Sequence, residues 1–175
     1  MKLKSLAVAL CLILISQLGK AQSKIADLVK DWERSKAYTK EYLDAMPESS
    51  YTLKPTAEMR SFAEQNLHLA DANYGLAAAA TVTKNPIPQG SLEKSSDKSK
   101  ANVTKQVLAS YDFVIDLIKK MTDAQLDERI KLFGNLDMTK ATALTKVLEH
   151  QAHHRGQTTV YLRLAGVKPP QEKLF

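Results

Sequence analysis

The sequence lacks the features that mark disulfide-stapled and membrane-spanning proteins. Its 175 residues include a single cysteine, Cys11, so the chain has no pair of thiols for an internal disulfide. After residue 21 no apolar run approaches the roughly 20 residues that a membrane-spanning helix needs. A chain of this length can bury about 70% of its unfolded surface, so the stability of one domain must come from its core.

The first 21 residues are typical of a secretory signal peptide. Two lysines precede an apolar run, Leu6–Ile15, and the motif Gly19-Lys20-Ala21 ends in the small residues that signal peptidase accepts. The residues before Cys11 form a poor lipobox, so we do not expect a lipoprotein. We predict a signal peptide at 1–21 and an exported domain at 22–175, periplasmic or secreted.

Removal of the signal peptide would leave a domain with little net charge and no cysteine. The segment carries three lysines and no acid, so the net charge falls from +6 to +3. That excess is too weak to indicate a nucleic-acid partner. The absence of cysteine from 22–175 excludes a thiol nucleophile of the protein's own.

Apolar residues recur every three or four positions in four segments, which predicts four amphipathic helices. The second begins at a cap, Thr56 or Ser61. No segment shows the sustained alternation of a strand, so we predict an all-α fold, a four-helix bundle with ligands on facing helices. The predicted helices are Ile25–Met46, a second that runs from its cap to about Ala80, Ala101–Met121 and Thr139–Ala165.

Two connecting segments interrupt this pattern. Residues 83–98 are polar and contain two prolines and a glycine, which predicts an exposed, mobile loop long enough to cover a site mouth. Residues 130–136 are short and partly apolar and contain Gly134. We predict a connector there with at most a brief extended piece.

Three of the four histidines lie in a single five-residue stretch, 150–154, of the last predicted helix. His150 and His154 share one helix face, whereas His153 lies about 100° away from His154 and faces elsewhere. His68 stands on the second helix in a stripe of small residues that lets another helix or a ligand come close. Three neutral imidazoles and a water make an open metal site, which zinc or nickel suits and iron(II) also fits.

Other side chains on the two histidine stripes are candidates for the site. We expect Ala72, Gln157 and Tyr161 to line a pocket beside the histidines. Glu64, one turn before His68, is a candidate for a catalytic base or for a carboxylate that orients an imidazole. Asp71 is a second such candidate, and both residues are open to a simpler interpretation as solvated helix positions.

The spacing of His150 and His154 also matches the zincin motif H-E-x-x-H, in which the glutamate is the general base. In this sequence that position is Gln151, and an amide cannot take a proton from water at neutral pH. Glu149 precedes His150 and points about 100° away. A zincin-type protease is therefore not expected.

Two segments and their order resemble the DinB-like superfamily, which includes the YfiT-like metal proteins. The first is R-S-F-A-E-Q-N-L-H-L-A-D-A-N-Y at 60–74, and the second is H-Q-A-H-H-R-G-Q-T-T-V-Y-L-R-L-A-G-V-K-P-P at 150–170. The resemblance implies a four-helix bundle in which three histidines bind a divalent metal, often nickel or zinc. The positions that match are His68, His150 and His154.

The resemblance also implies a homodimer and a small-molecule reaction. Several members resemble transferases or isomerases that use low-molecular-weight thiols such as bacillithiol or mycothiol, and the metal would present the thiolate to an electrophile. Those thiols are cytosolic, which conflicts with the signal peptide. Three hypotheses therefore stay open: a metal-dependent transferase or hydrolase, a metal- or ligand-binding module without turnover, and a bundle whose histidines are core polar residues.

Overall fold

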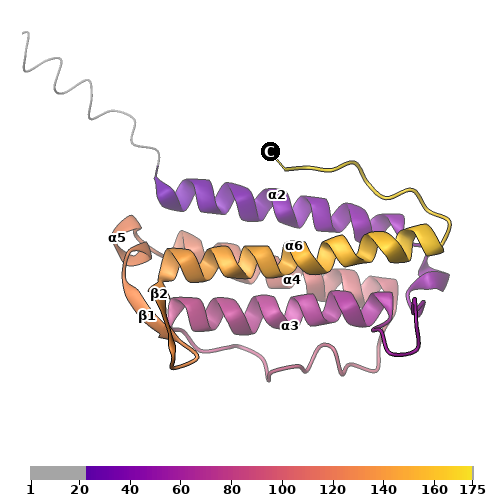
Figure 1. Ribbon diagram of the computed structural model, residues 1–175, viewed down its shortest axis with the longest axis horizontal. Helices are drawn as coiled ribbons and strands as arrows, with labels where there is room; N and C mark the ends of the chain where they lie inside the picture. Colours follow the sequence, from indigo (N-terminus) through magenta and orange to yellow (C-terminus); the bar gives the residue numbers. More distant parts are fainter. Residues whose placement is uncertain (1–22, 175) are drawn as a thin grey trace, which may run out of the picture.

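The computed structural model of the protein describes residues 23–174 and consists mainly of four long helices that run side by side as a bundle (Figure 1). The all-α, four-helix prediction is confirmed. The predicted signal peptide lies outside the described residues. The long helices are α2 (Lys24–Ala45), α3 (Phe62–Thr81), α4 (Lys100–Lys119) and α6 (Lys140–Leu164).

Side-chain caps fix where these helices begin. Ser61 starts α3 with a capping box, in which its hydroxyl accepts the backbone N–H of Glu64 and the Glu64 carboxylate accepts the N–H of Ser61. Ser61 is thus the cap, and Thr56 is not. Thr139 caps α6 by accepting the N–H of Thr142, as expected, and Gly166 follows the helix at φ +74°, a conformation that costs glycine little.

The connector before α6 contains more regular structure than the sequence predicted. A short helix, α5 (Asp123–Leu126), leads into an antiparallel hairpin of β1 (Arg129–Leu132) and β2 (Leu136–Thr139). Each strand has only four residues: β1 alternates the exposed Arg129 and Lys131 with the half-buried Ile130 and the buried Leu132, whereas the burial of β2 does not alternate. An alternation over a single four-residue strand is too short to stand out as a strand signal in the sequence. The tip of the hairpin carries Phe133, which is 65% exposed and has φ +52°.

The core contains a polar layer where α2, α4 and α6 meet. The side chain of Gln151 is fully buried, and its carbonyl oxygen accepts hydrogen bonds from Tyr111 Oη at 2.5 Å and from Arg155 Nη1 at 2.8 Å. Its amide group donates to Ser35 Oγ at 3.1 Å. The guanidinium of Arg155 lies over the ring of Tyr38, 4.6 Å from its centroid. Gln151 therefore connects three helices.

The loop at 83–98 runs along α3 and is tied to that helix by its second half (Figure 1). The carboxylate of Asp71 accepts the backbone N–H groups of Leu92 at 3.2 Å and Glu93 at 2.8 Å. The ammonium group of Lys98 donates to the carbonyl oxygen of Glu93. These contacts hold the side chain of Glu93 over the middle of α3. Among the described residues, no helix is long and apolar enough to cross a membrane.

Candidate metal centre

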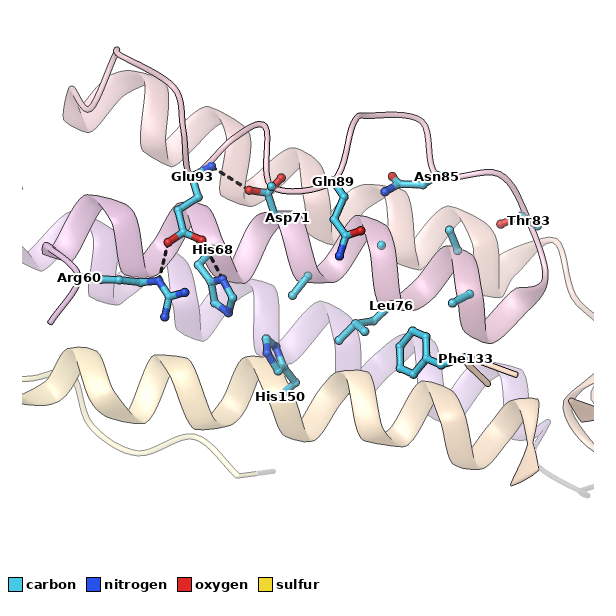
Figure 2. Close-up of a pocket in the computed structure, with 15 residues that line it drawn as sticks. Arg60, His68, Asp71, Leu76, Thr83, Asn85, Gln89, Glu93, Phe133 and His150 are labelled. Carbon is cyan, nitrogen blue, oxygen red and sulfur yellow. Dashed lines mark hydrogen bonds and ion pairs between the residues drawn. The ribbon is translucent and has the colours of Figure 1, made fainter. Parts of the chain in front are cut away.

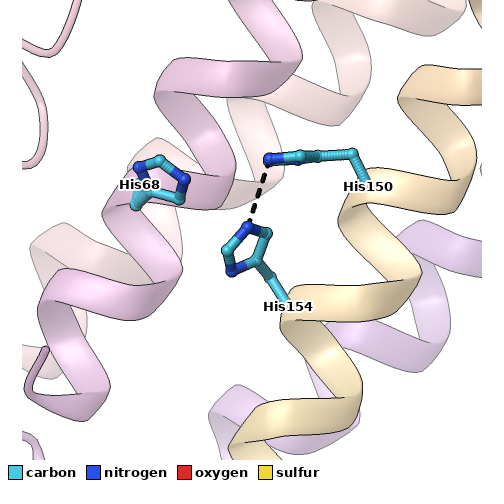
Figure 3. Close-up of side chains that lie close together, drawn as sticks. All are labelled: His68, His150 and His154. Atoms are coloured by element: carbon cyan, nitrogen blue, oxygen red, sulfur yellow. Dashed lines mark hydrogen bonds between the residues drawn. The ribbon is translucent and has the colours of Figure 1, made fainter. Parts of the chain in front are cut away.

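Figure 3 shows that the side chains of His68, His150 and His154 converge from α3 and α6. One nitrogen from each imidazole lies within 4.8 Å of the other two. The ring centroid of His154 lies 4.7 Å from the ring centroid of His68 and 4.4 Å from that of His150. His153 does not join the group: it is exposed, and its Nε2 lies 2.8 Å from Nε2 of Gln157.

The donor set fits a divalent ion of the zinc or nickel type. Nε2 of His150 lies 3.1 Å from Nε2 of His154, and two nitrogens that share a zinc ion at 2.0–2.1 Å lie about 3.3 Å apart. Nδ1 of His150 is buried and has no hydrogen-bond partner within the part of the chain that the structure describes. Three clustered imidazoles without a carboxylate ligand favour a metal that prefers nitrogen.

The environment keeps two of these histidines neutral, which is the protonation state that binds metal. Burial is the main cause that lowers the pKa of His154, and together with the neighbouring His150 and His68 it brings that pKa to about 3. Burial is also the main cause that lowers the pKa of His150, with His68 contributing. Protons therefore compete weakly with a metal ion at neutral pH.

Glu93, which the sequence did not identify, supports His68. Its Oε2 lies 3.0 Å from Nδ1 of His68, and its Oε1 accepts a hydrogen bond from Arg60 Nε at 2.6 Å (Figure 2). Burial raises the pKa of Glu93, but the hydrogen bonds from Arg60 and His68 together outweigh it and leave the pKa below its usual value. The carboxylate thus stays charged and accepts the Nδ1 proton of His68, which leaves the Nε2 lone pair free.

His154 has an amide neighbour in place of a carboxylate. Nε2 of Gln65, a buried residue of α3, lies 2.9 Å from Nδ1 of His154 and also contacts Oε1 of Gln157. An amide turned by 180° presents its oxygen instead of its nitrogen, so Gln65 can also accept the Nδ1 proton of His154. Gln65 was missed as well, because no spacing on α3 marks it as a partner of α6.

We expect replacement of Glu93 with alanine to weaken metal binding by about 10- to 100-fold, the usual cost of losing a carboxylate behind a metal-binding histidine. Titration with zinc in the presence of a competing chelator measures this. Glu58→Ala is the matched control, because Glu58 is an acid of the same neighbourhood that contacts none of the histidines. Equal losses in both variants would mean that only the general charge matters.

The other two candidate carboxylates bond to backbone N–H groups of the helix start and the loop. Glu64 belongs to the capping box of α3, and its Oε2 also lies 3.7 Å from Lys54 Nζ. The backbone hydrogen bond from Ser61 is the main cause that lowers its pKa. Asp71 holds the loop through Leu92 and Glu93. Each carboxylate therefore has a local structural role.

Replacing Glu64 with alanine is expected to lower the free energy of unfolding by about 1 kcal/mol, because half of the capping box is lost. Glu64→Gln preserves the box and should stay near wild type. Denaturant unfolding measures both variants, and metal content should not change. If Glu64→Gln lost activity by about 100-fold at unchanged stability, Glu64 would be a base after all.

The three predicted pocket residues lie in two different hollows. Ala72 lines a cavity of about 640 Å³ that reaches His68 and His150 (Figure 2). Gln157 and Tyr161 line a second hollow of about 500 Å³. Arg60 and Glu93 line both. Tyr161 itself is buried, and its hydroxyl donates to the carbonyl oxygen of Arg60 at 2.7 Å.

The family assignment rests on a comparison of the sequence with protein-family models. The model of the DinB superfamily matches residues 31–158. The chain belongs to the DinB superfamily. The matched range contains all three clustered histidines of this DinB-superfamily protein and the loop that carries Glu93.

Individual relatives are more distant or match over a shorter range. The uncharacterized protein YrdA of Bacillus subtilis (strain 168) is 44% identical over 62 residues, 35% of this chain and 36% of YrdA. The match thus spans little more than a third of that relative's length.

Solved structures of DinB-like proteins share the fold. A DinB-like protein from Bacillus cereus has a TM-score of 0.75 at 20% identity, over 88% of this chain and 100% of its own. YfiT from Bacillus subtilis, described as a probable metal-dependent hydrolase with an unusual four-helix bundle topology, has a TM-score of 0.65 at 16% identity, over 85% and 91%. At these identities the likeness establishes the fold alone.

Proposed function

We propose that this protein binds one divalent metal ion through His68, His150 and His154 and uses it to hydrolyse a small molecule. The observation that carries the proposal is the convergence of three imidazoles beside a cavity that reaches two of them. We propose zinc or nickel as the metal, with iron(II) as the alternative. Such an ion would polarise the bond to be broken and lower the pKa of a water or thiol that it binds.

Side chains next to the histidines would hold the imidazole rings in position and fix which ring nitrogen carries the proton. Glu93 accepts the Nδ1 proton of His68 and is itself held by Arg60. Gln65 orients the ring of His154. The YfiT likeness adds support by analogy, because that protein is described as a probable metal-dependent hydrolase.

A metal- or ligand-binding module without turnover is the second candidate. It is favoured by the carboxylates around the site, because Glu64, Asp71 and Glu93 are each engaged in structural contacts. With these three engaged, hydrolysis would depend on the metal for activation of water. Transfer of an external thiol is a further variant of the enzyme, consistent with the absence of cysteine from 22–175.

The setting of the activity is part of the proposal. The features of residues 1–21 support export, to the periplasm or out of the cell. A small-molecule substrate is supported by the size of the cavity beside the histidines, which is typical of small-ligand sites.

Elemental analysis followed by a turnover screen tests the proposal. Protein covering residues 22–175 should retain about one metal ion per chain after dialysis. The loaded protein is then screened against chromogenic carboxylic and phosphoric esters, and against electrophiles with added thiols. Metal retention with no turnover in either screen would favour the binding module. Failure to retain any metal would overturn both candidates.

A further inference from the structure

The cavity beside the histidines extends well beyond the metal-binding group. It runs along α3 from His68 to Ala79, between that helix and the loop at 83–98 (Figure 2). At a rise of 1.5 Å per residue this distance is about 16 Å. Hydrolysis of a compact substrate would use only the end nearest His68 and His150. The remainder of the cavity is therefore available for a long substituent.

The floor of the cavity is apolar and narrow. It consists of successive turns of α3 that carry Ala72, Gly75, Leu76 and Ala79, all partly accessible, whereas most other positions on this helix are buried. A methyl group added at Gly75 would lie 3.7 Å from Nδ2 of Asn85 in the overlying loop. The amide of Asn85 thus overhangs this turn of α3 closely, which leaves little room at Gly75 for a branched or bulky group.

The far part of the cavity carries no charge. The loop contributes the amide side chains of Asn85 and Gln89, and the hairpin contributes the ring of Phe133 (Figure 2). The charged residues that line the cavity lie toward its other end. Among them, Glu93 is paired with Arg60 and His68, and Asp71 is bonded to the loop backbone. An apolar arm can lie here without leaving a buried charge unpaired.

We infer that the substrate is an uncharged carboxylic ester or amide with a slender apolar arm. The arm lies along α3, from Ala72 toward the ring of Phe133 at the hairpin tip. This inference rests on the proposed function and names the substrate class of the same site. Water adds its oxygen to the carbonyl carbon, the C–O or C–N bond breaks, and the alcohol or amine leaves with a proton. The carboxylic acid is the other product.

Binding of linear hydroxamates to the zinc-loaded protein tests the arm without requiring turnover, because a hydroxamate binds the metal through its own oxygens. Acetohydroxamate is compared with octanohydroxamate, which has six more methylene groups. A fully buried methylene gains about fourfold in affinity, so six half-buried ones should gain on the order of 50-fold. A chain of the same length that ends in a carboxylate should lose most of that gain, because the charge finds no partner. Calorimetry measures each affinity.

The variant Gly75→Leu fills the cavity, and its side chain meets only ordinary contacts at the first carbon. We expect it to bind acetohydroxamate as the wild type does but to reduce the gain from the longer chain to less than about threefold. Gly75→Ala should give an intermediate gain. Gly156→Leu is the matched control, because Gly156 is also helical, is exposed and has nothing within 4 Å of an added carbon.

The outcomes separate this inference from the proposed function. Retained zinc and bound acetohydroxamate, with no gain from the longer chain, would overturn the substrate class and leave the metal site intact. A gain that persists in Gly75→Leu would overturn the placement of the arm on α3. Loss of zinc from the wild type would overturn the proposed function and the inference with it.

Discussion

Replacing His154 with alanine is expected to abolish metal binding under ordinary assay conditions. Binding free energies of structural zinc are about 10–16 kcal/mol, so losing one of three protein ligands should cost about 4 kcal/mol, or roughly 1000-fold in affinity. His154 is the most buried of the three histidines, at 8% exposure. Its ring centroid lies 4.7 Å from that of His68 and 4.4 Å from that of His150, so its loss leaves only two imidazoles of the group. Metal content after dialysis and chelator competition measure the effect.

His153→Ala is the matched control, since it removes an imidazole from the adjacent position of the same helix. His153 is exposed, and its Nε2 lies against the side chain of Gln157, outside the group of three histidines, so this variant should keep its metal. Equal and low metal content in the wild type and His154→Ala would show that the histidines are core polar residues. His150→Ala should behave like His154→Ala, because its Nε2 lies 3.1 Å from that of His154.

Replacing Gln151 with leucine is expected to lower the free energy of unfolding by about 3–5 kcal/mol. The change removes the carbonyl oxygen that accepts from Arg155 and Tyr111, and it leaves a guanidinium of 8% exposure without its closest acceptor. Leucine has a similar volume, so a cavity contributes little. Denaturant unfolding at pH 7 measures the loss.

A double variant distinguishes a lost polar partner from a packing defect. Gln151→Leu combined with Arg155→Leu should be less destabilised than the sum of the single changes, because both polar partners are gone. Gln106→Leu, on the surface of α4, should stay within about 0.5 kcal/mol of wild type. A loss below 1 kcal/mol in Gln151→Leu would mean that water or another side chain satisfies Arg155.

The helices and the histidine cluster could be predicted because their signals are local. Four periodic segments gave the bundle, and the four-residue spacing of His150 and His154 placed both rings on one face of α6. The partner at His68 was marked by the small residues around it, which now form the floor of the cavity. Both the helices and the positions of the histidines on them follow from a spacing of three or four residues along the sequence.

The side chains that support the cluster could not be found in this way. Glu93 lies in an irregular loop and reaches His68 only because Asp71 fixes two backbone N–H groups of that loop. Gln65 meets His154 across two helices. Neither contact follows a helical or strand period, so both depend on the tertiary fold. Glu64 shows the reverse case: its spacing to His68 suggested chemistry, but the first turn of α3 uses its carboxylate.

A metal ion bound by the three imidazoles would also lower the conformational entropy of the unfolded chain. An ion held by His68 and His150 would close a loop between α3 and α6 in a domain that has no cysteine for a disulfide. In the chain-entropy model a cross-link over such a loop is worth about 4–5 kcal/mol. In the exported protein that we propose, such a reversible cross-link would make resistance to unfolding and proteolysis depend on the supply of metal.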